Sequence, residues 1–128
     1  RVGEEHARDC YNWKAMLDLG LHVSGGSDCP VEPFNVLDNM RAAVTRQNRA
    51  GTKTYLPEQA LTVEQAIRLF TSDAAWPSRD EGVRGTLEGG KQADLVVLDQ
   101  DLFEIQPSRF PQVKVLETVL NGVTVYQA

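Results

Sequence analysis

The stretch Leu21-His-Val-Ser-Gly-Gly-Ser-Asp-Cys-Pro-Val31 decides the fold of this chain. A short apolar run enters it, two glycines and a serine follow, and one carboxylate, Asp28, stands shortly before a proline that prevents regular strand pairing. This order predicts a buried strand over residues 21–24 that leads to Asp28, where the glycines let the backbone and a ligand approach closely. In α/β barrels the catalytic groups lie at such strand ends. The stretch therefore predicts a functional site built around Asp28.

Length, charge and cysteine content restrict the class of protein. The chain has 128 residues, a net charge of -5 and 41% hydrophobic residues, which suits one small domain or part of a larger one. The acidic balance argues against a nucleic acid or an anionic membrane as partner. Because the chain begins at Arg1 without a Met or an apolar leader, it is expected to be processed, trimmed or cut from a longer protein. Two cysteines without a close pair predict reduced thiols and a cytoplasmic location.

Apolar periodicity predicts three helices around this stretch. The first covers residues 3–19 and ends at Gly20, a residue typical of a helix C-cap. The second covers residues 34–49. The third runs from Thr62 to about residue 75 and opens with a capping box, Thr62-Val-Glu-Gln65. Helices on both sides of a short buried strand are typical of a βα repeat.

Beyond about residue 78 the helical pattern stops and turns alternate with β-branched runs. Residues 95–98 form a continuous apolar strand. Residues 113–120 and 123–126 flank Asn121-Gly122, the strongest short turn signal for a β-hairpin. A domain boundary is therefore expected between residues 78 and 84.

Five motifs resemble the C-terminal end of the amidohydrolase superfamily, and most closely amidohydrolase family 3, the YtcJ-like branch that includes N-substituted formamide deformylases. They occur in the family's order and cover nearly the whole chain. The motifs are Gly-Gly-Ser-Asp-Cys-Pro-Val (residues 25–31), Ala-Ala-Val-Thr-Arg (42–46), Leu-Thr-Val-Glu-Gln-Ala (61–66), Gly-Thr-Leu-Glu-Gly-Gly-Lys-Gln-Ala-Asp-Leu-Val-Val-Leu-Asp (85–99) and Thr-Val-Leu-Asn-Gly-Val-Thr-Val-Tyr (118–126).

The resemblance implies an α/β fold, the C-terminal fragment of a (β/α)₈ TIM barrel followed by half of a small β-sandwich. Residues 1–80 would be the end of the barrel domain, with residues 21–27 as its last strand. Residues 81–128 would be the C-terminal part of a sandwich that full members build from both ends of the chain. The first seven strands of the barrel are then expected outside this sequence.

The same resemblance implies a metal-dependent hydrolase of C–N bonds. Asp28 matches the family's aspartate that binds the catalytic metal and activates a water, so it is the predicted metal ligand and general base. Arg46 ends the Ala-Val-Thr-Arg motif and is the predicted substrate-binding residue, either pairing with a substrate carboxylate or bracing the loop that carries Asp28. The expected cofactor is a divalent metal, zinc by ligand type.

Other reactive side chains are expected to be structural. His6 is predicted to be solvent-exposed, His22 to be a packed or barrel-wall residue, and Cys29 to lack a base that would make it a nucleophile. Lys91 and Asp94 are predicted to hold a Gly-Gly turn against the following strand. One carboxylate cannot hold a catalytic zinc, which takes three or more protein ligands. This chain alone is therefore expected to bind no metal and to be inactive.

Two hypotheses follow. In the first, this is the C-terminal portion of a metal-dependent amidohydrolase that acts on a small amide-type substrate, with the missing ligands upstream or on a separate chain. In the second, it is a truncated, non-catalytic chain that serves as a structural or oligomerisation module. Either way a partial barrel leaves strand edges and apolar faces unpaired, so a homo-oligomer or association with the missing N-terminal part is expected.

Overall fold

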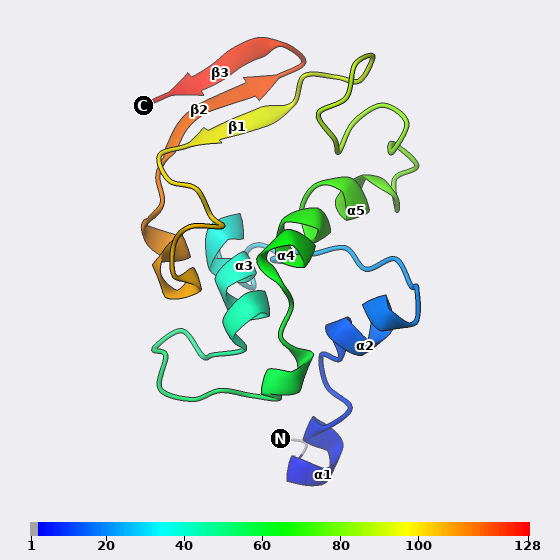
Figure 1. Cartoon of the computed structure of the whole chain (residues 1–128), viewed down its shortest axis with the longest axis vertical. Helices are drawn as coiled ribbons and strands as arrows, with labels where there is room; N and C mark the ends of the chain where they lie inside the picture. The colour runs from blue at the N-terminus through cyan, green and yellow to red at the C-terminus, as the bar shows by residue number, and fades with distance from the viewer. Residues whose placement is uncertain (1–2) are drawn as a thin grey trace.

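A computed structural model describes residues 3–128 as a group of short helices with a three-stranded antiparallel sheet at one end (Figure 1). Helix α1 and strand β3 lie at opposite ends of the molecule. The elements in chain order are α1 (Gly3–Ala7), α2 (Trp13–Asp18), α3 (Val36–Thr45), the 3₁₀ helix η1 (Pro57–Gln59), α4 (Val63–Leu69), α5 (Ser72–Ala75), β1 (Leu95–Leu98), the 3₁₀ helix η2 (Pro107–Gln112), β2 (Val115–Leu120) and β3 (Val123–Gln127). No helix among these residues is long and apolar enough to cross a membrane.

The prediction of one helix over residues 3–19 is wrong, since the chain forms two helices, α1 and α2. Between them Tyr11 adopts a left-handed conformation with φ 58°. The Asn12 side-chain amide donates to the Arg8 carbonyl oxygen at 3.0 Å, a local bond that competes with the helical pattern. Trp13 and Leu17 of α2 pack against the core.

The predicted strand over residues 21–24 is also not formed. Residues 21–27 are extended, but no strand lies beside them within the described chain. A β-strand is defined by its ladder of hydrogen bonds to a neighbouring strand. In place of such a ladder, the Gly25 N–H donates one hydrogen bond to the Leu69 carbonyl oxygen of α4, at 2.8 Å. The end of α4 therefore holds the stretch that was expected to lie in a sheet.

Helix α3 begins two residues later and ends four residues earlier than the predicted range 34–49. The Asn35 side chain accepts from the Leu37 N–H at 3.1 Å and caps its N-terminus. Its C-cap is Arg46, with φ 55°, so the helix stops at Thr45 and not at residue 49. Beyond it an isolated bridge pairs Gln47 with Thr54 and reverses the chain.

The capping box at the start of α4 is confirmed. The Gln65 N–H donates to Thr62 Oγ1 at 3.1 Å, and the Thr62 N–H donates to Gln65 Oε1 at 2.9 Å. The predicted helix over residues 62–75 breaks after Leu69 into α4 and α5. At the break the Thr71 hydroxyl donates to the Ile67 carbonyl oxygen at 2.9 Å, so a side chain binds a carbonyl that a continuous helix would use.

The sheet has the order β1-β2-β3, and its hairpin is confirmed. Asn121 and Gly122 both have positive φ, 50° and 77°, as the tight turn between β2 and β3 requires. This turn is fastened to the start of β1, because the Asn121 N–H donates to Asp94 Oδ1 at 2.7 Å and the Gly122 N–H donates to the Ala93 carbonyl oxygen at 3.0 Å.

Strands β1 and β2 are joined by a long excursion, residues 99–114, that contains η2 and packs against α3. Phe110 in η2 is the largest fully buried side chain, with 0% exposure. The buried core takes residues from the helices and from this excursion: Met40, Ala43, Leu61, Ala66, Leu69, Leu102, Phe110 and Val113. Residues on both sides of the boundary expected at 78–84 therefore share one core.

Candidate functional site

Asp28 lies on the surface in a tight turn that follows the extended stretch. Its φ is 52°, a left-handed conformation in which Asp and Asn are the most tolerated residues after glycine. Its carbonyl oxygen accepts from the Val31 N–H at 2.9 Å, and the Ser27 carbonyl oxygen accepts from the Glu32 N–H at 3.2 Å. Among the described residues no hydrogen bond or ion pair engages its carboxylate, which is therefore free to take an external ligand.

The extended stretch reaches this turn through Gly25, which packs on Phe70 at the break between α4 and α5. A Cβ at position 25 would lie 2.5 Å from Phe70 Cζ, closer than such atoms approach in real proteins. The sequence suggested that this glycine leaves room for a substrate. In the structure the Phe70 ring occupies this space. Gly25 and Phe70 are far apart in the sequence, so no local sequence pattern could have revealed their contact.

Metal-ligating side chains do not gather around Asp28. Within residues 3–128 there is no group of three or more His, Cys, Asp or Glu side chains that could hold a metal ion. His6 is exposed, and Cys29 is an exposed free thiol. His22 stacks on Trp76, with ring centroids 4.1 Å apart and an angle of 6° between the rings. Asp28 alone therefore offers one ligand of the three or more that zinc takes.

Arg46 lies at the C-terminal end of α3 with its side chain inside the protein, 9% exposed. Its Nε donates to the Tyr55 carbonyl oxygen at 3.1 Å, and its guanidinium carbon lies 5.1 Å from the centre of the Trp13 ring. Burial lowers the pKa of the Arg46 guanidinium, and the Glu58 carboxylate opposes this effect. These contacts tie the loop after α3 to α2.

Asp28 and Arg46 are not brought together. The contacts of Arg46 run to Trp13 and Tyr55, whereas the stretch that carries Asp28 contacts the end of α4. The structure gives no hydrogen bond or ion pair between Asp28 and Arg46. The contact with Trp13 could have been suspected only from the two residue types, since an arginine often stacks on a tryptophan.

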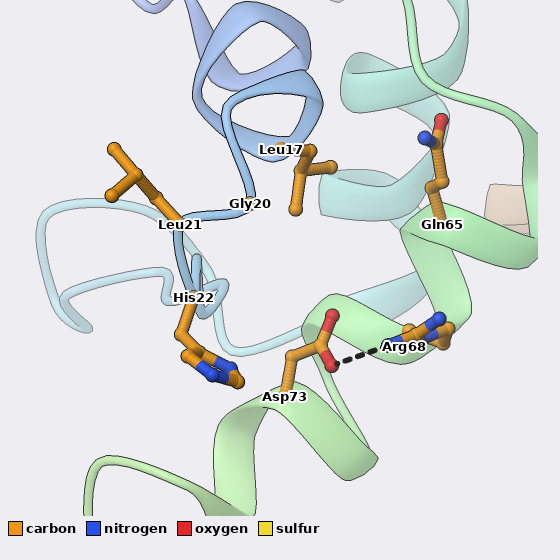
Figure 2. A pocket seen from close by; sticks show the side chains of 7 residues that line it. All are labelled: Leu17, Gly20, Leu21, His22, Gln65, Arg68 and Asp73. Atoms are coloured by element: carbon orange, nitrogen blue, oxygen red, sulfur yellow. Dashed lines mark hydrogen bonds and ion pairs between the residues drawn. The ribbon is translucent and has the colours of Figure 1, made fainter.

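A hollow of about 250 Å³ lies at the other end of the extended stretch (Figure 2). Arg68 and Asp73 form an ion pair in its lining, with Arg68 Nη2 3.2 Å from Asp73 Oδ1, so their charges offset one another. The Gln65 amide oxygen is already used in the capping box. Asp28 does not line this hollow; the lining residues are Leu17, Gly20, Leu21, His22, Gln65, Arg68 and Asp73. Because Arg68, Asp73 and Gln65 already bond within the protein, the hollow is better suited to packing than to catalysis.

Lys91 and Asp94 make structural contacts, but Asp94 holds the turn between β2 and β3 and not the Gly89-Gly90 turn for which it was predicted. Lys91 Nζ donates to the Glu81 carbonyl oxygen at 2.7 Å and to Thr86 Oγ1 at 2.6 Å. Asp94 accepts from the backbone of the β2–β3 turn. Both side chains are used within the C-terminal region and are not available for catalysis.

Comparisons with known proteins agree over nearly the full sequence. The model of a family described as the amidohydrolase family matches residues 1–126. YtcJ of Bacillus subtilis (strain 168) is 33% identical over 129 residues, which is 99% of this chain and 24% of YtcJ. The N-substituted formamide deformylase of Arthrobacter pascens is 33% identical over 124 residues, covering 97% of this chain and 22% of that enzyme. The chain thus spans less than a quarter of the length of these curated relatives.

The fold has a counterpart among solved structures. A crystal structure of an amidohydrolase from Thermotoga maritima MSB8 matches with a TM-score of 0.70 and 22% sequence identity. The match covers 92% of this chain and 26% of that one. At this identity the likeness concerns the fold, and it shows that helices and sheet together correspond to one part of a larger protein's structure.

Proposed function

This chain belongs to the amidohydrolase family, and from that membership we propose that it is the C-terminal portion of a metal-dependent hydrolase that cleaves C–N bonds of the amide or formamide type. The observation that carries the proposal is the family match over residues 1–126, with a free, exposed carboxylate at Asp28. The name of the Arthrobacter pascens relative supports a small N-substituted formamide as the substrate class.

In this proposal Asp28 is a metal ligand and the general base. Asp28 would hold a divalent metal, zinc by ligand type, together with other ligands, and the bound metal would lower the pKa of a coordinated water towards neutrality. The Asp28 carboxylate takes the proton of the attacking water and passes it to the leaving amine. Asp28 can serve as one ligand within a larger set, since residues 3–128 contain no group of three or more side chains that could hold a metal ion by themselves. The remaining ligands belong to the N-terminal part of the complete enzyme.

We propose that residues 1–80 are the end of a TIM barrel and that residues 81–128 are half of a β-sandwich. The unpaired stretch 21–27 supports this, because an extended segment without a ladder leaves backbone groups for a neighbouring strand. The sheet supports it too, since every residue of β3 is exposed, including Val123 at 64% and Val125 at 58%. An apolar sheet surface of this kind suits burial by a second layer.

Arg46 is proposed to brace the loop that follows α3, with substrate binding as the alternative. Replacing it with alanine removes the bond to Tyr55 and the Trp13 contact, and is expected to lower the free energy of unfolding by roughly 1–3 kcal/mol. Urea denaturation measures this, with Arg49→Ala, an arginine on the surface, as the control. Unchanged stability combined with a raised KM for a carboxylate-bearing substrate would instead support the substrate-binding role.

The alternative function is a non-catalytic module that self-associates through its exposed apolar surface. Two measurements separate the proposals. The first is the coding sequence upstream of Arg1, where an in-frame segment with a His-x-His strand supports the hydrolase. The second is elemental analysis, in which the complete polypeptide is expected to carry metal and residues 1–128 alone to carry none. A complete, folded polypeptide without bound metal, or a reading frame that starts near Arg1, would leave the non-catalytic module as the better account.

A further inference from the structure

We propose that Phe70 is a positioning residue for Asp28, an inference that rests on the role proposed above for that carboxylate. Phe70 is the C-cap of α4, where the helix breaks before α5. The residue contributes no polar group to the site. It acts through the backbone of Gly25, three residues before Asp28.

The contact between Phe70 and Gly25 is specific in shape. A Cβ built on Gly25 would lie 2.5, 2.7 and 2.9 Å from Phe70 Cζ, Cε1 and Cε2, so the tip of the ring points at the glycine Cα. The neighbouring Gly25 N–H donates to the Leu69 carbonyl oxygen at 2.8 Å. Two successive residues at the end of α4 therefore hold this one glycine, the first by a hydrogen bond and the second by steric contact.

This contact bears on Asp28 because, among the contacts that hold the stretch leading to it, this one lies nearest to Asp28 in the sequence. The others lie farther upstream, where His22 stacks on Trp76 and Val23 packs against the core. After Gly25 only Gly26 and Ser27 intervene before the turn, which is closed by the Val31 and Glu32 N–H groups. Phe70 in turn packs against the buried core, so its ring has a fixed place. The backbone three residues before Asp28 is thus held by a ring 45 residues away from Gly25 in the sequence.

The test measures metal affinity in the complete polypeptide, with Co²⁺ as the probe and its visible absorption as the readout. Phe70→Leu withdraws the ring from Gly25 and is expected to weaken Co²⁺ binding roughly 10- to 100-fold, the usual range for residues that orient a metal ligand. Phe70→Met, a milder change, is expected to give a smaller loss in the same direction. The control is Val113→Ala, which removes buried volume from the same core far from Asp28 in sequence, and should lower Tm without changing Co²⁺ affinity more than about twofold.

A compensating pair sharpens the test. Gly25→Ala introduces a Cβ against the ring and is expected to weaken Co²⁺ binding, whereas Gly25→Ala with Phe70→Leu should regain part of the loss because the shorter side chain leaves room. Gly89→Ala is the matched control, since a Cβ there has no neighbour within 4 Å.

The outcomes are distinct. The inference would be overturned if the Phe70 variants bound Co²⁺ as tightly as the Val113→Ala variant while their Tm fell by the same amount. Asp28→Asn, measured beside them, is expected to lose Co²⁺ binding. If it does so while the Phe70 variants bind normally, the positioning role fails and the proposed function stands. If Asp28→Asn itself binds Co²⁺ normally, the proposed function fails with it.

Discussion

Replacing Asp28 with asparagine is expected to lower the hydrolytic activity of the complete enzyme by at least about 10³-fold, within the range for loss of a general base. Asparagine keeps the size of the side chain and tolerates the left-handed backbone, φ 52°, as well as aspartate does. It removes the negative charge that would bind the metal and accept the proton. Initial rates of amine release from an N-substituted formamide measure the effect.

Folding should be unaffected by this substitution. Asp28 is exposed, and its carboxylate has no hydrogen-bond or ion-pair partner among the described residues, so the free energy of unfolding should change by less than about 0.5 kcal/mol. Asp9→Asn, at another exposed acidic residue, is the control and should retain full activity. A variant Asp28→Asn that keeps a tenth or more of the activity with its normal metal content would exclude Asp28 as the base.

Replacing Phe110 with alanine is expected to destabilise the protein by about 3–5 kcal/mol. Phe110 is fully buried, and the helix η2 that carries it packs on α3. Its loss leaves a cavity between the helices and the excursion that joins β1 to β2. Because domains of this size are stable by only about 5–15 kcal/mol, the loss is a large share of the total. Urea denaturation followed by far-UV circular dichroism measures it.

The matched control is Phe103→Ala, in the same excursion. Phe103 is 62% exposed, so its removal should change stability by less than about 0.5 kcal/mol. Phe110→Leu, which keeps most of the buried volume, should lie between the two. Equal stability of the Phe110→Ala and Phe103→Ala variants would mean that the excursion contributes no core, contrary to the packing described here.

Local sequence signals predicted local structure well. The capping box at Thr62 and the Asn121-Gly122 turn were both anticipated, because each depends on side chains within a few residues. Strand β1 was anticipated from its continuous apolar run. Helix ends were predicted less well: Tyr11 and Arg46 adopt left-handed conformations that their residue types do not signal.

Features that depend on distant residues could not be predicted. The stretch 21–27 has the composition of a buried strand, but no partner strand lies beside it in the described chain. Asp28 was identified through its motif, whereas the contact between Gly25 and Phe70 requires knowledge of how α4 lies against that stretch. The helix η2 was missed because Pro107 and Pro111 obscure its pattern, although it carries the most buried aromatic residue.

The excursion between β1 and β2 has a consequence for the order in which the chain folds. The β2–β3 hairpin is closed by a two-residue turn and can form from local contacts, on the microsecond scale typical of hairpins. Strand β1 must wait, because closing residues 99–114 costs chain entropy that is recovered only once Phe110 has docked on the helices. The sheet is therefore expected to grow from its C-terminal end backwards, with its first strand joining last, in the same cooperative step that completes the core.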